Sequence, residues 1–352
     1  ALGDEAENRR LGEDYRTRGC TFRSGGEETA PEEDVDCEEP ENATNPQCIE
    51  ALVSGDALAY QFQDAVAAYE RAETSRNAGD MAAATPLYEE AATLLIGAVN
   101  ADPNHRDSPR ALLLAAQALV YTGRNDAAAR IFQRVVDEVG PLDARGDAER
   151  QLELDHILAV AYFSLATAAR QSFDYVRALE NYRTLAESAR FERSTDPEMP
   201  GMREDSVVES ARMLEYTQSY ADAATYYRRA AEIIDDPAER RAAYFRIALM
   251  SYRREDWSGT IREMNAFIDR YRSDSAAVEE VVEAAWHIHE AREAARSSAS
   301  DRSAALRTVV DHYSRLGGTR GSMAAEYAAH ARFILAEPTL TEFEDFSIDA
   351  GH

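Results

Sequence analysis

The densest group of side chains that could carry out chemistry is the run Trp286-His287-Ile288-His289-Glu290. Imidazole groups bind zinc and transfer protons near neutral pH. On a helix, however, side chains two positions apart point about 200° away from each other, so His287 and His289 cannot share one metal ion. We expect one of them to pack in the core and the other to face solvent. The run predicts no metal site and no cofactor.

Other catalytic signatures are absent from the sequence. It contains no phosphate-binding loop, dinucleotide fingerprint, nucleophile elbow or metalloprotease helix. Acidic pairs such as Asp235-Asp236 and Glu279-Glu280 fall at expected helix ends or on expected solvent faces. Nucleophilic catalysis of acyl transfer uses a nucleophile, a base and oxyanion donors that converge, and no such set is visible. We therefore expect a protein that is not an enzyme, with no catalytic residues.

Three cysteines, Cys20, Cys37 and Cys48, lie in the first fifty residues, and none follows. Their spacing, without a histidine nearby, matches no zinc or haem signature. In an oxidising compartment two of them would form a disulfide and leave one thiol. Three free thiols are the other interpretation, and the sequence leaves both open.

The charge of the chain excludes one class of partner. Its 352 residues include 38 basic and 65 acidic ones, for a formal net charge of −27. Nucleic-acid binding depends on clustered positive charge, so we expect no nucleic-acid partner. Every basic residue is arginine, whereas ordinary usage would give about twenty lysines. A GC-rich genome and a high-salt habitat both account for this composition, because an acidic surface stays soluble where salt screens repulsion.

Residues 1–48 form a separate acidic, low-complexity leader. Between Ser24 and Glu50 the sequence has ten acidic and no basic residues. Such a segment cannot bury enough apolar surface to offset its ordering entropy, so we expect it to be extended unless packing on the rest of the chain or on a partner orders it. No stretch approaches the roughly 18 apolar residues of a membrane span. The chain begins at Ala1 without a signal sequence, so we expect a processed product or a numbering that starts inside a longer one.

From about residue 48 onward the sequence predicts an all-α body. Apolar residues recur at i, i+3, i+4 and i+7, separated by short Gly, Asp, Asn or Pro segments. The expected helices are 50–78, 81–100, 108–122, 125–139, 147–171, 175–190, 204–217, 220–234, 238–253, 257–271, 276–296, 301–315, 322–336 and 339–346.

The expected helices form pairs that resemble one another. From Ser108 to Pro141, a helix with Ala116 at its seam leads through Gly123 to a second helix with Ala128 at the matching place. This order is similar to the tetratricopeptide repeat (TPR), in which small residues stand where two antiparallel helices cross. Related positions recur in an earlier pair, at Ala72 and Ala84, and in later pairs, at Ala166, Ala178, Ala211, Ala223, Ala248 and Thr260. The resemblance implies a right-handed TPR-like helical-repeat solenoid over residues 49–336, followed by a short C-terminal helix and tail, 337–352.

Two connections are longer than a regular array needs. The seam residues Ala128, Ala178 and Ala223 are 50 and 45 residues apart, whereas regular repeats keep 34. We therefore expect long loops at 140–149 and 192–203. The second carries Pro197 and Pro200, and we expect it to be a functional loop or a flexible joint. The stretch Phe267 to Ser273 also resembles the second-helix ending of bacterial envelope repeat proteins, with Arg272 where those proteins have proline. The composition of the chain, which is rich in alanine and arginine and has no lysine, is similar as well to that of large repeat proteins of gliding-motility machineries.

The family resemblance places partner-binding residues on the first helix of each pair, where stacked helices line a concave groove. Arginines interleaved with aromatic rings there could bind carboxylates and stack on an extended peptide. The alternative is that these arginines form ion pairs with neighbouring glutamates of the same chain. The residues implied are Arg110, Gln117, Tyr121, Arg170, Arg212, Tyr216, Arg246, Tyr252 and Arg253.

The sequence thus favours a non-catalytic scaffold that binds a protein or peptide partner, acidic or ending in a carboxylate, within a bacterial envelope or motility assembly. The other hypothesis is a structural subunit of an extracellular or envelope-associated multimer, in which the acidic leader makes contacts between copies. We expect a periplasmic or extracellular location, with the cytoplasm as the alternative. Oligomerisation is compatible with either function.

Overall fold

The computed structural model describes residues 46–144 and 146–344, with side chains for residues 60–144 and 146–340. The described residues form helices and turns and contain no strand. They divide into two compact units, of which the first ends at Val139 and the second begins at Gly140. The all-α class predicted from the periodicity is confirmed.

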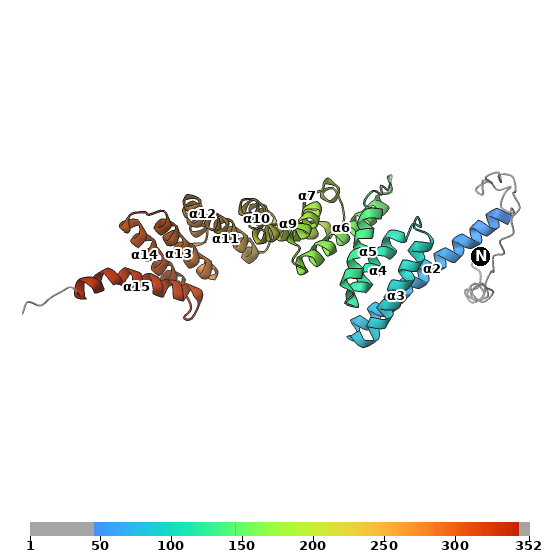
Figure 1. Ribbon diagram of the computed structural model, residues 1–352, viewed down its shortest axis with the longest axis horizontal. Coiled ribbons are helices and arrows are strands. Elements are labelled where there is room, and N and C mark those ends of the chain that lie inside the picture. The colour runs from blue at the N-terminus through green and yellow to red at the C-terminus, as the bar shows by residue number, and fades with distance from the viewer. Residues whose placement is uncertain (1–45, 145, 345–352) are drawn as a thin grey trace, which may run out of the picture. The chain divides into compact units, whose positions relative to one another are not determined.

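The first unit consists of two helix pairs (Figure 1). Helix α2 packs against α3, α3 against α4 and α4 against α5. Tyr88, Leu95, Leu112 and Phe132 are among the side chains buried between them. The bounds are α2 Pro46–Asn77, α3 Met81–Ala101, α4 Ser108–Tyr121 and α5 Asn125–Val139.

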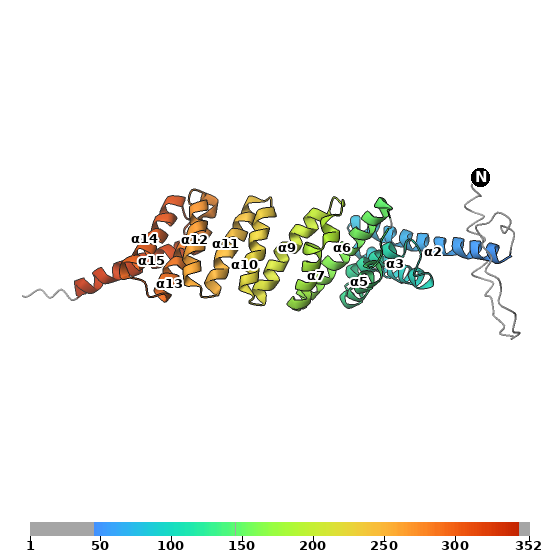
Figure 2. The same ribbon diagram turned by 90° about the horizontal axis from the view of Figure 1, so that it is seen from above.

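The second unit continues the same design, and its helices lie side by side in chain order (Figure 2). First helices α6, α9, α11 and α13 alternate with second helices α7, α10, α12 and α14, and α15 packs against α13 and α14. The bounds are α6 Ala148–Gln171, α7 Tyr175–Glu187, α8 Ala189–Glu192, α9 Met199–Tyr216, α10 Tyr220–Ile233, α11 Pro237–Arg253, α12 Trp257–Tyr271, η2 Ser275–Ala277, α13 Val278–Ala294, α14 Ala299–Leu316 and α15 Met323–Glu344. The predicted helical-repeat fold of antiparallel helix pairs is confirmed.

Small residues allow the paired helices to approach closely. Ala166, Ala178, Ala211, Ala223 and Thr260 all have no exposed surface. A larger side chain at any of these places would push two helix axes apart, because protein interiors are close-packed. The seam positions that the sequence pattern identified are therefore core positions in the structure.

The turn inside each pair has one recurrent geometry. In the pair α9 and α10, for example, the N–H of Ser219 donates to the carbonyl of Leu214, five residues earlier. Gln218, the residue before Ser219, has a left-handed backbone conformation. Together with this hydrogen bond it forms the Schellman ending of a helix. Glycine occupies this position at Gly79 and Gly123, but other turns hold non-glycine residues there with φ between +53° and +62°. These residues are Phe173, Gln218, Glu255 and Arg296.

Two predicted boundaries were wrong. Helix α9 begins at Met199, because Pro200 occupies its first turn, where a missing N–H costs nothing. The connection expected at 192–203 is correspondingly shorter. At the other end α15 runs without interruption through Pro338 to Glu344, where the sequence suggested a break and a separate short helix.

Helix α6 is the one described helix that is long and apolar enough by composition to cross a membrane. Its most apolar window has a mean hydropathy of 1.3, and 39% of that window is buried. The helix packs against α7 and α9, and Leu154, Ile157 and Leu158 are buried. These contacts are typical of a core helix of a helical-repeat protein.

Candidate functional site: the arginine face of the second unit

A buried carboxylate near the end of α9 holds two arginines of α11. Glu215 is 8% exposed, and its Oε1 lies 2.7 Å from Arg246 Nη1 and 2.6 Å from Arg253 Nη1. The other oxygen, Oε2, accepts a hydrogen bond of 2.6 Å from the hydroxyl of Tyr227. Burial and the hydrogen bond to Glu215 raise the pKa of Tyr227 far above its ordinary value. Glu215 therefore links α9, α10 and α11.

A second carboxylate on α9 repeats this arrangement with arginines of two helices. Glu209 Oε1 lies 2.5 Å from Nη1 of Arg212, three residues later, and Glu209 Oε2 lies 3.8 Å from Nε of Arg170 on α6. The Nε of Arg170 is buried and makes no hydrogen bond within the protein. The side chain of Glu209 is 15% exposed, so this carboxylate also lies beneath its arginines.

We call the set Arg170, Glu209, Arg212, Glu215, Arg246 and Arg253 the arginine face. Its four guanidinium groups exceed its two carboxylates, so its formal charge is +2 in a chain whose net charge is −27. The arginine side chains are 38% to 53% exposed, whereas the two carboxylates are at most 15% exposed. A guanidinium group has five N–H donors, and the side directed at solvent is available to an anion.

Exposed aromatic rings border the arginine face. Tyr216 follows Glu215 on α9 and is 57% exposed, and its ring stacks on Tyr175 with centroids 4.9 Å apart. Phe173 lies edge-on to Tyr175 at 6.3 Å and is 77% exposed. Val176, on the first turn of α7, is 62% exposed. Rings of this kind supply apolar contact area beside the charges.

Tyr252, also expected to bind a partner, packs inside the second unit instead of extending from it. Its ring centroid lies 4.2 Å from that of His287 on α13 and 6.0 Å from that of Trp257 on α12. Burial and the charge of Glu290 raise the pKa of Tyr252 to about 12. The residue is half-buried, and its first role is to join α11 to α13.

The expectation of one buried and one solvated histidine on α13 was wrong. His287 and His289 are 9% and 5% exposed, because α13 is covered by α12, α14 and α15 as well as by Tyr252. His287 Nδ1 lies 2.7 Å from Glu290 Oε2, and its Nε2 lies 3.5 Å from Glu283 Oε1. Burial opposes a charged imidazole, but these two carboxylates outweigh it and raise the pKa of His287.

Residues expected to bind a partner in the first unit lie on α4. Gln117 Oε1 accepts a hydrogen bond of 3.3 Å from the hydroxyl of Tyr69. Tyr121 stacks on Tyr88 with centroids 4.7 Å apart, and the guanidinium of Arg76 lies 4.8 Å above its ring. Arg110 is exposed at the other end of the helix. Aromatic stacking thus occupies one face of Tyr121.

The predictions for the cysteines, a disulfide or free thiols, are not tested by the described residues. Cys20 and Cys37 lie outside the described residues, and Cys48 lies in α2 where only the backbone is described. Among the described side chains, no group of three or more His, Cys, Asp or Glu could hold a metal ion.

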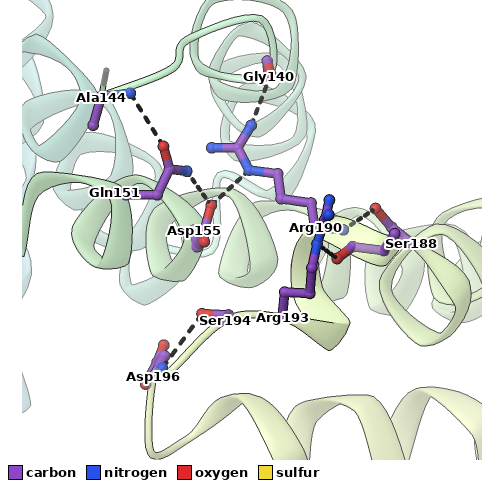
Figure 3. Close-up of polar contacts among 10 residues, drawn as sticks. Gly140, Ala144, Gln151, Asp155, Ser188, Arg190, Arg193, Ser194 and Asp196 are labelled. Atoms are coloured by element: carbon purple, nitrogen blue, oxygen red, sulfur yellow. Dashed lines mark hydrogen bonds and ion pairs between the residues drawn. The ribbon is translucent and has the colours of Figure 1, made fainter. Parts of the chain in front are cut away.

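The long connection before α6 is fastened by a hydrogen-bond network (Figure 3). Asp155 is 5% exposed, and its Oδ1 accepts from Arg190 Nε at 2.6 Å and from Gln151 Nε2 at 2.7 Å. Arg190 Nη1 donates to the carbonyl of Gly140 at 2.8 Å, and Gln151 Oε1 accepts from the N–H of Ala144 at 3.1 Å. These bonds tie the connection to α6 and α8.

A cavity of about 400 Å³ adjoins this network, and it is lined by Leu142, Asp143, Gln151, Asp155, Arg190 and Arg193. It is open to solvent, and two arginines and two carboxylates line it. Arg190 Nη2 is buried and makes no hydrogen bond within the protein, so a water molecule or a ligand oxygen would find a donor there.

The connection before α9 is held to the same helix. His156 Nδ1 on α6 lies 2.8 Å from Asp196 Oδ2, and the side chain of Asp196 is 4% exposed. Asp196 Oδ1 also accepts from the N–H of Glu198 at 2.9 Å. Both long loops of the second unit thus contact the N-terminal half of α6, at Gln151 and at His156.

Sequence reasoning found the arginines of the site but missed Glu209, Tyr175 and Phe173. Glu209 stands three residues before Arg212, and this spacing predicts an ion pair on a helix. The contact from Arg170 to Glu209 joins two helices across 39 positions, and no local pattern contains it. Phe173 could have been noticed as an aromatic residue at a turn where the first unit has glycine.

Comparisons with known proteins give low similarities. No family model matches the chain, and no curated protein sequence matches it. The C-terminal part of a TPR repeat-containing protein from Cytophaga hutchinsonii is similar in structure, with 14% identity and a TM-score of 0.49, over 82% of this chain and 95% of that one. A tetratricopeptide repeat protein from Parabacteroides merdae has 13% identity and a TM-score of 0.38, over 77% and 99%. The fold described above therefore rests on the chain's own helix pairs.

Proposed function

We propose that this protein is a non-catalytic scaffold of TPR-like helix pairs, whose arginine face binds an acidic segment of a partner protein. The observation that carries the proposal is the pairing of two nearly buried carboxylates with four half-exposed arginines on α6, α9 and α11. Buried carboxylates orient the guanidinium groups, and the excess positive charge remains on the solvent side.

The geometry suits a carboxylate-rich ligand. Arginine binds carboxylates with two parallel N–H donors, and Arg246 and Arg253 each direct Nη1 at Glu215. Their remaining nitrogens can approach a second carboxylate from the solvent side. Tyr216, the residue after Glu215, stacks on Tyr175, and these rings offer stacking area for an apolar side chain of the same ligand. An extended peptide that alternates acidic and apolar residues fits both features.

The proposal includes the cellular location and the type of assembly in which this function takes place. The segment Phe267 to Ser273, at the end of α12, supports a place among bacterial envelope or motility assemblies through its resemblance to their repeat endings. Phe267 and Ile268 of that segment are core residues, so the resemblance also reflects the packing of a second helix. A periplasmic or extracellular location accompanies the proposal.

The test is peptide binding by the full chain and by a face variant. A fluorescein-labelled heptapeptide of alternating glutamate and leucine, with a free C-terminal carboxylate, is titrated with protein and followed by anisotropy. We expect Arg246→Gln with Arg253→Gln to weaken binding at least fivefold, and the dissociation constant of the wild-type chain to rise with NaCl.

Matched controls come from the second helices of the same pairs. Arg228 on α10 and Arg262 on α12 are both exposed, and replacing both with glutamine removes the same formal charge. We expect this control to bind within a factor of two of wild type. Equal losses in the two double variants would mean that the peptide senses net charge alone, and the proposed face would be wrong.

A further inference from the structure

The strongest anion that the sequence itself supplies is its own acidic segment. Residues 27–41 contain nine acidic and no basic residues, with Val35 and Cys37 among them. The segment thus carries a third of the chain's formal charge of −27. Most of the chain's surface would repel such a polyanion, and only a locally positive region would hold it.

The arginine face is such a region. Each of its two carboxylates carries two guanidinium groups, and each arginine uses a single nitrogen in the contacts described above. Tyr216, 57% exposed, lies at its edge. An acidic run that includes an apolar side chain such as Val35 complements both the excess charge and the exposed ring.

We propose that the arginine face of one copy binds the acidic segment 27–41 of a second copy. The proposal rests on the proposed function, because it uses the same face and names its occupant. The contact is heterologous: a face on one copy meets a different segment on the next, so repetition gives rings or open chains. A partner with a competing acidic segment would then release copies from one another.

The cysteine distribution makes a direct test simple, because residues 49–352 contain none. A donor chain with Cys20→Ser and Cys48→Ser keeps Cys37 as its one thiol, inside the acidic segment, and is labelled there with benzophenone maleimide. The acceptor is a tagged full chain with all three cysteines replaced by serine. The mixture is irradiated and digested with trypsin, and the crosslinked peptides are identified by mass spectrometry.

We expect a crosslinked dimer whose adducts map to α6, α9 and α11. Arg246→Gln with Arg253→Gln in the acceptor should lower the dimer yield at least fivefold, and 0.5 M NaCl should lower it similarly. The Arg228→Gln and Arg262→Gln acceptor should keep at least half of the wild-type yield. Melting temperatures within about 2 °C of wild type establish that each acceptor is folded.

A second variant tests the donor side and leaves the face intact. Replacing Glu32, Glu33, Asp34 and Asp36 by their amides should reduce the dimer yield as strongly as the face variant does. Crosslinks confined to one chain, adducts outside the three helices, or a yield insensitive to both variants would each overturn the proposal. If these occur while the labelled heptapeptide still needs Arg246 and Arg253, the proposed function stands and only this occupant is wrong. Loss of heptapeptide binding specificity as well would reject both.

Discussion

Glu215 and Arg253 form an asymmetric ion pair: the carboxylate side chain is 7% exposed and the guanidinium side chain 38% exposed, with 2.6 Å between Oε1 and Nη1. The same oxygen contacts Arg246, and the second oxygen accepts from Tyr227. The carboxylate is therefore almost completely buried, while each arginine side chain stays partly exposed to solvent. Loss of the carboxylate and loss of an arginine should have different consequences.

Replacing Glu215 with glutamine should destabilise the second unit, because three donors lose a charged acceptor. Hydrogen bonds to charged groups contribute about 1.5 to 3 kcal/mol each. Glutamine keeps one acceptor oxygen, so we expect a loss of about 2 kcal/mol, measured by urea unfolding. For a unit of this size the melting temperature should fall by roughly 4 to 8 °C.

Arg246→Gln is the matched comparison for that change. Its side chain is 45% exposed, and ion pairs with an exposed partner contribute about 0.2 to 1 kcal/mol. We expect a loss below about 1 kcal/mol. A stability loss equal to that of Glu215→Gln would show that the arginine is structural, which would contradict its assignment to partner binding.

Glycine in place of a left-handed residue in one of the turns should stabilise the protein. Gln218 has φ of +60°, and a non-glycine residue in the left-handed region costs about 1 to 2 kcal/mol. Glycine removes that cost but adds about 0.5 to 1 kcal/mol of unfolded-state entropy. Gln218→Gly should therefore raise the free energy of unfolding by about 0.5 kcal/mol, seen as a higher urea midpoint.

Gly123 gives the reverse experiment in the first unit. Its φ is +74°, and a Cβ there would meet no atom within 4 Å. The cost of Gly123→Ala is then that of the backbone alone, about 1 kcal/mol of destabilisation. If both substitutions shift stability in the same direction, backbone strain does not control these turns.

The fold was accessible from the sequence because each helix pair repeats its signals locally. Seam residues such as Ala178 and Ala223 mark the crossings, and the period of 3.6 marks the buried side. Predicted boundaries are wrong where one residue type has two roles: the sequence pattern predicts a loop at Pro200, although proline also fits a helix's first turn. The sequence also left the arginines with two interpretations. Internal ion pairs are confirmed for the four arginines of the arginine face, and partner binding stays a prediction.

Partners that meet across helices could not be predicted. Asp155 and Arg190 are 35 positions apart, and their contact depends on how α8 returns to α6. Likewise, nothing in the run around His287 shows that Tyr252 covers it. Long-range pairs of this kind follow from the angle between elements, which local periodicity does not encode.

Removing the Asp155 carboxylate should strongly lower the stability of the structure around it. Breaking a buried ion pair by removing one partner costs about 3 to 5 kcal/mol, and Asp155 and Arg190 side chains are 7% and 23% exposed. We expect Asp155→Ala to cost about 3 kcal/mol. Hydrogen exchange should quicken at the amide of Ala144, whose N–H donates to Gln151, itself held by Asp155. Unchanged exchange there would mean that the loop does not depend on this network.

His287 predicts a pH dependence with a definite sign. Glu283 and Glu290 on its own helix and the ring of Tyr252 surround it, and its pKa is raised despite burial. A histidine with a raised folded-state pKa binds more protons in the folded state, so its contribution to stability is complete below the unfolded pKa of about 6.5. It is lost as the pH rises through the folded-state pKa. The wild-type advantage over His287→Gln in urea unfolding should therefore shrink between pH 6 and pH 8.5.

His312 on α14 is the matched control, because its shift has the opposite sign. It is 7% exposed, and Arg315 Nη2 lies 2.7 Å from its Nδ1. Burial and the charge of Arg315 lower the pKa of His312, so the folded state favours the neutral ring. Its contribution is present above about pH 6.5 and is lost as the pH falls through the folded-state value. The wild-type advantage over His312→Gln should then grow as the pH rises toward about 6.5 and stay constant at higher pH, where that over His287→Gln declines. Parallel slopes for the two variants would show that the general charge of the chain, and not these two sites, sets its pH dependence.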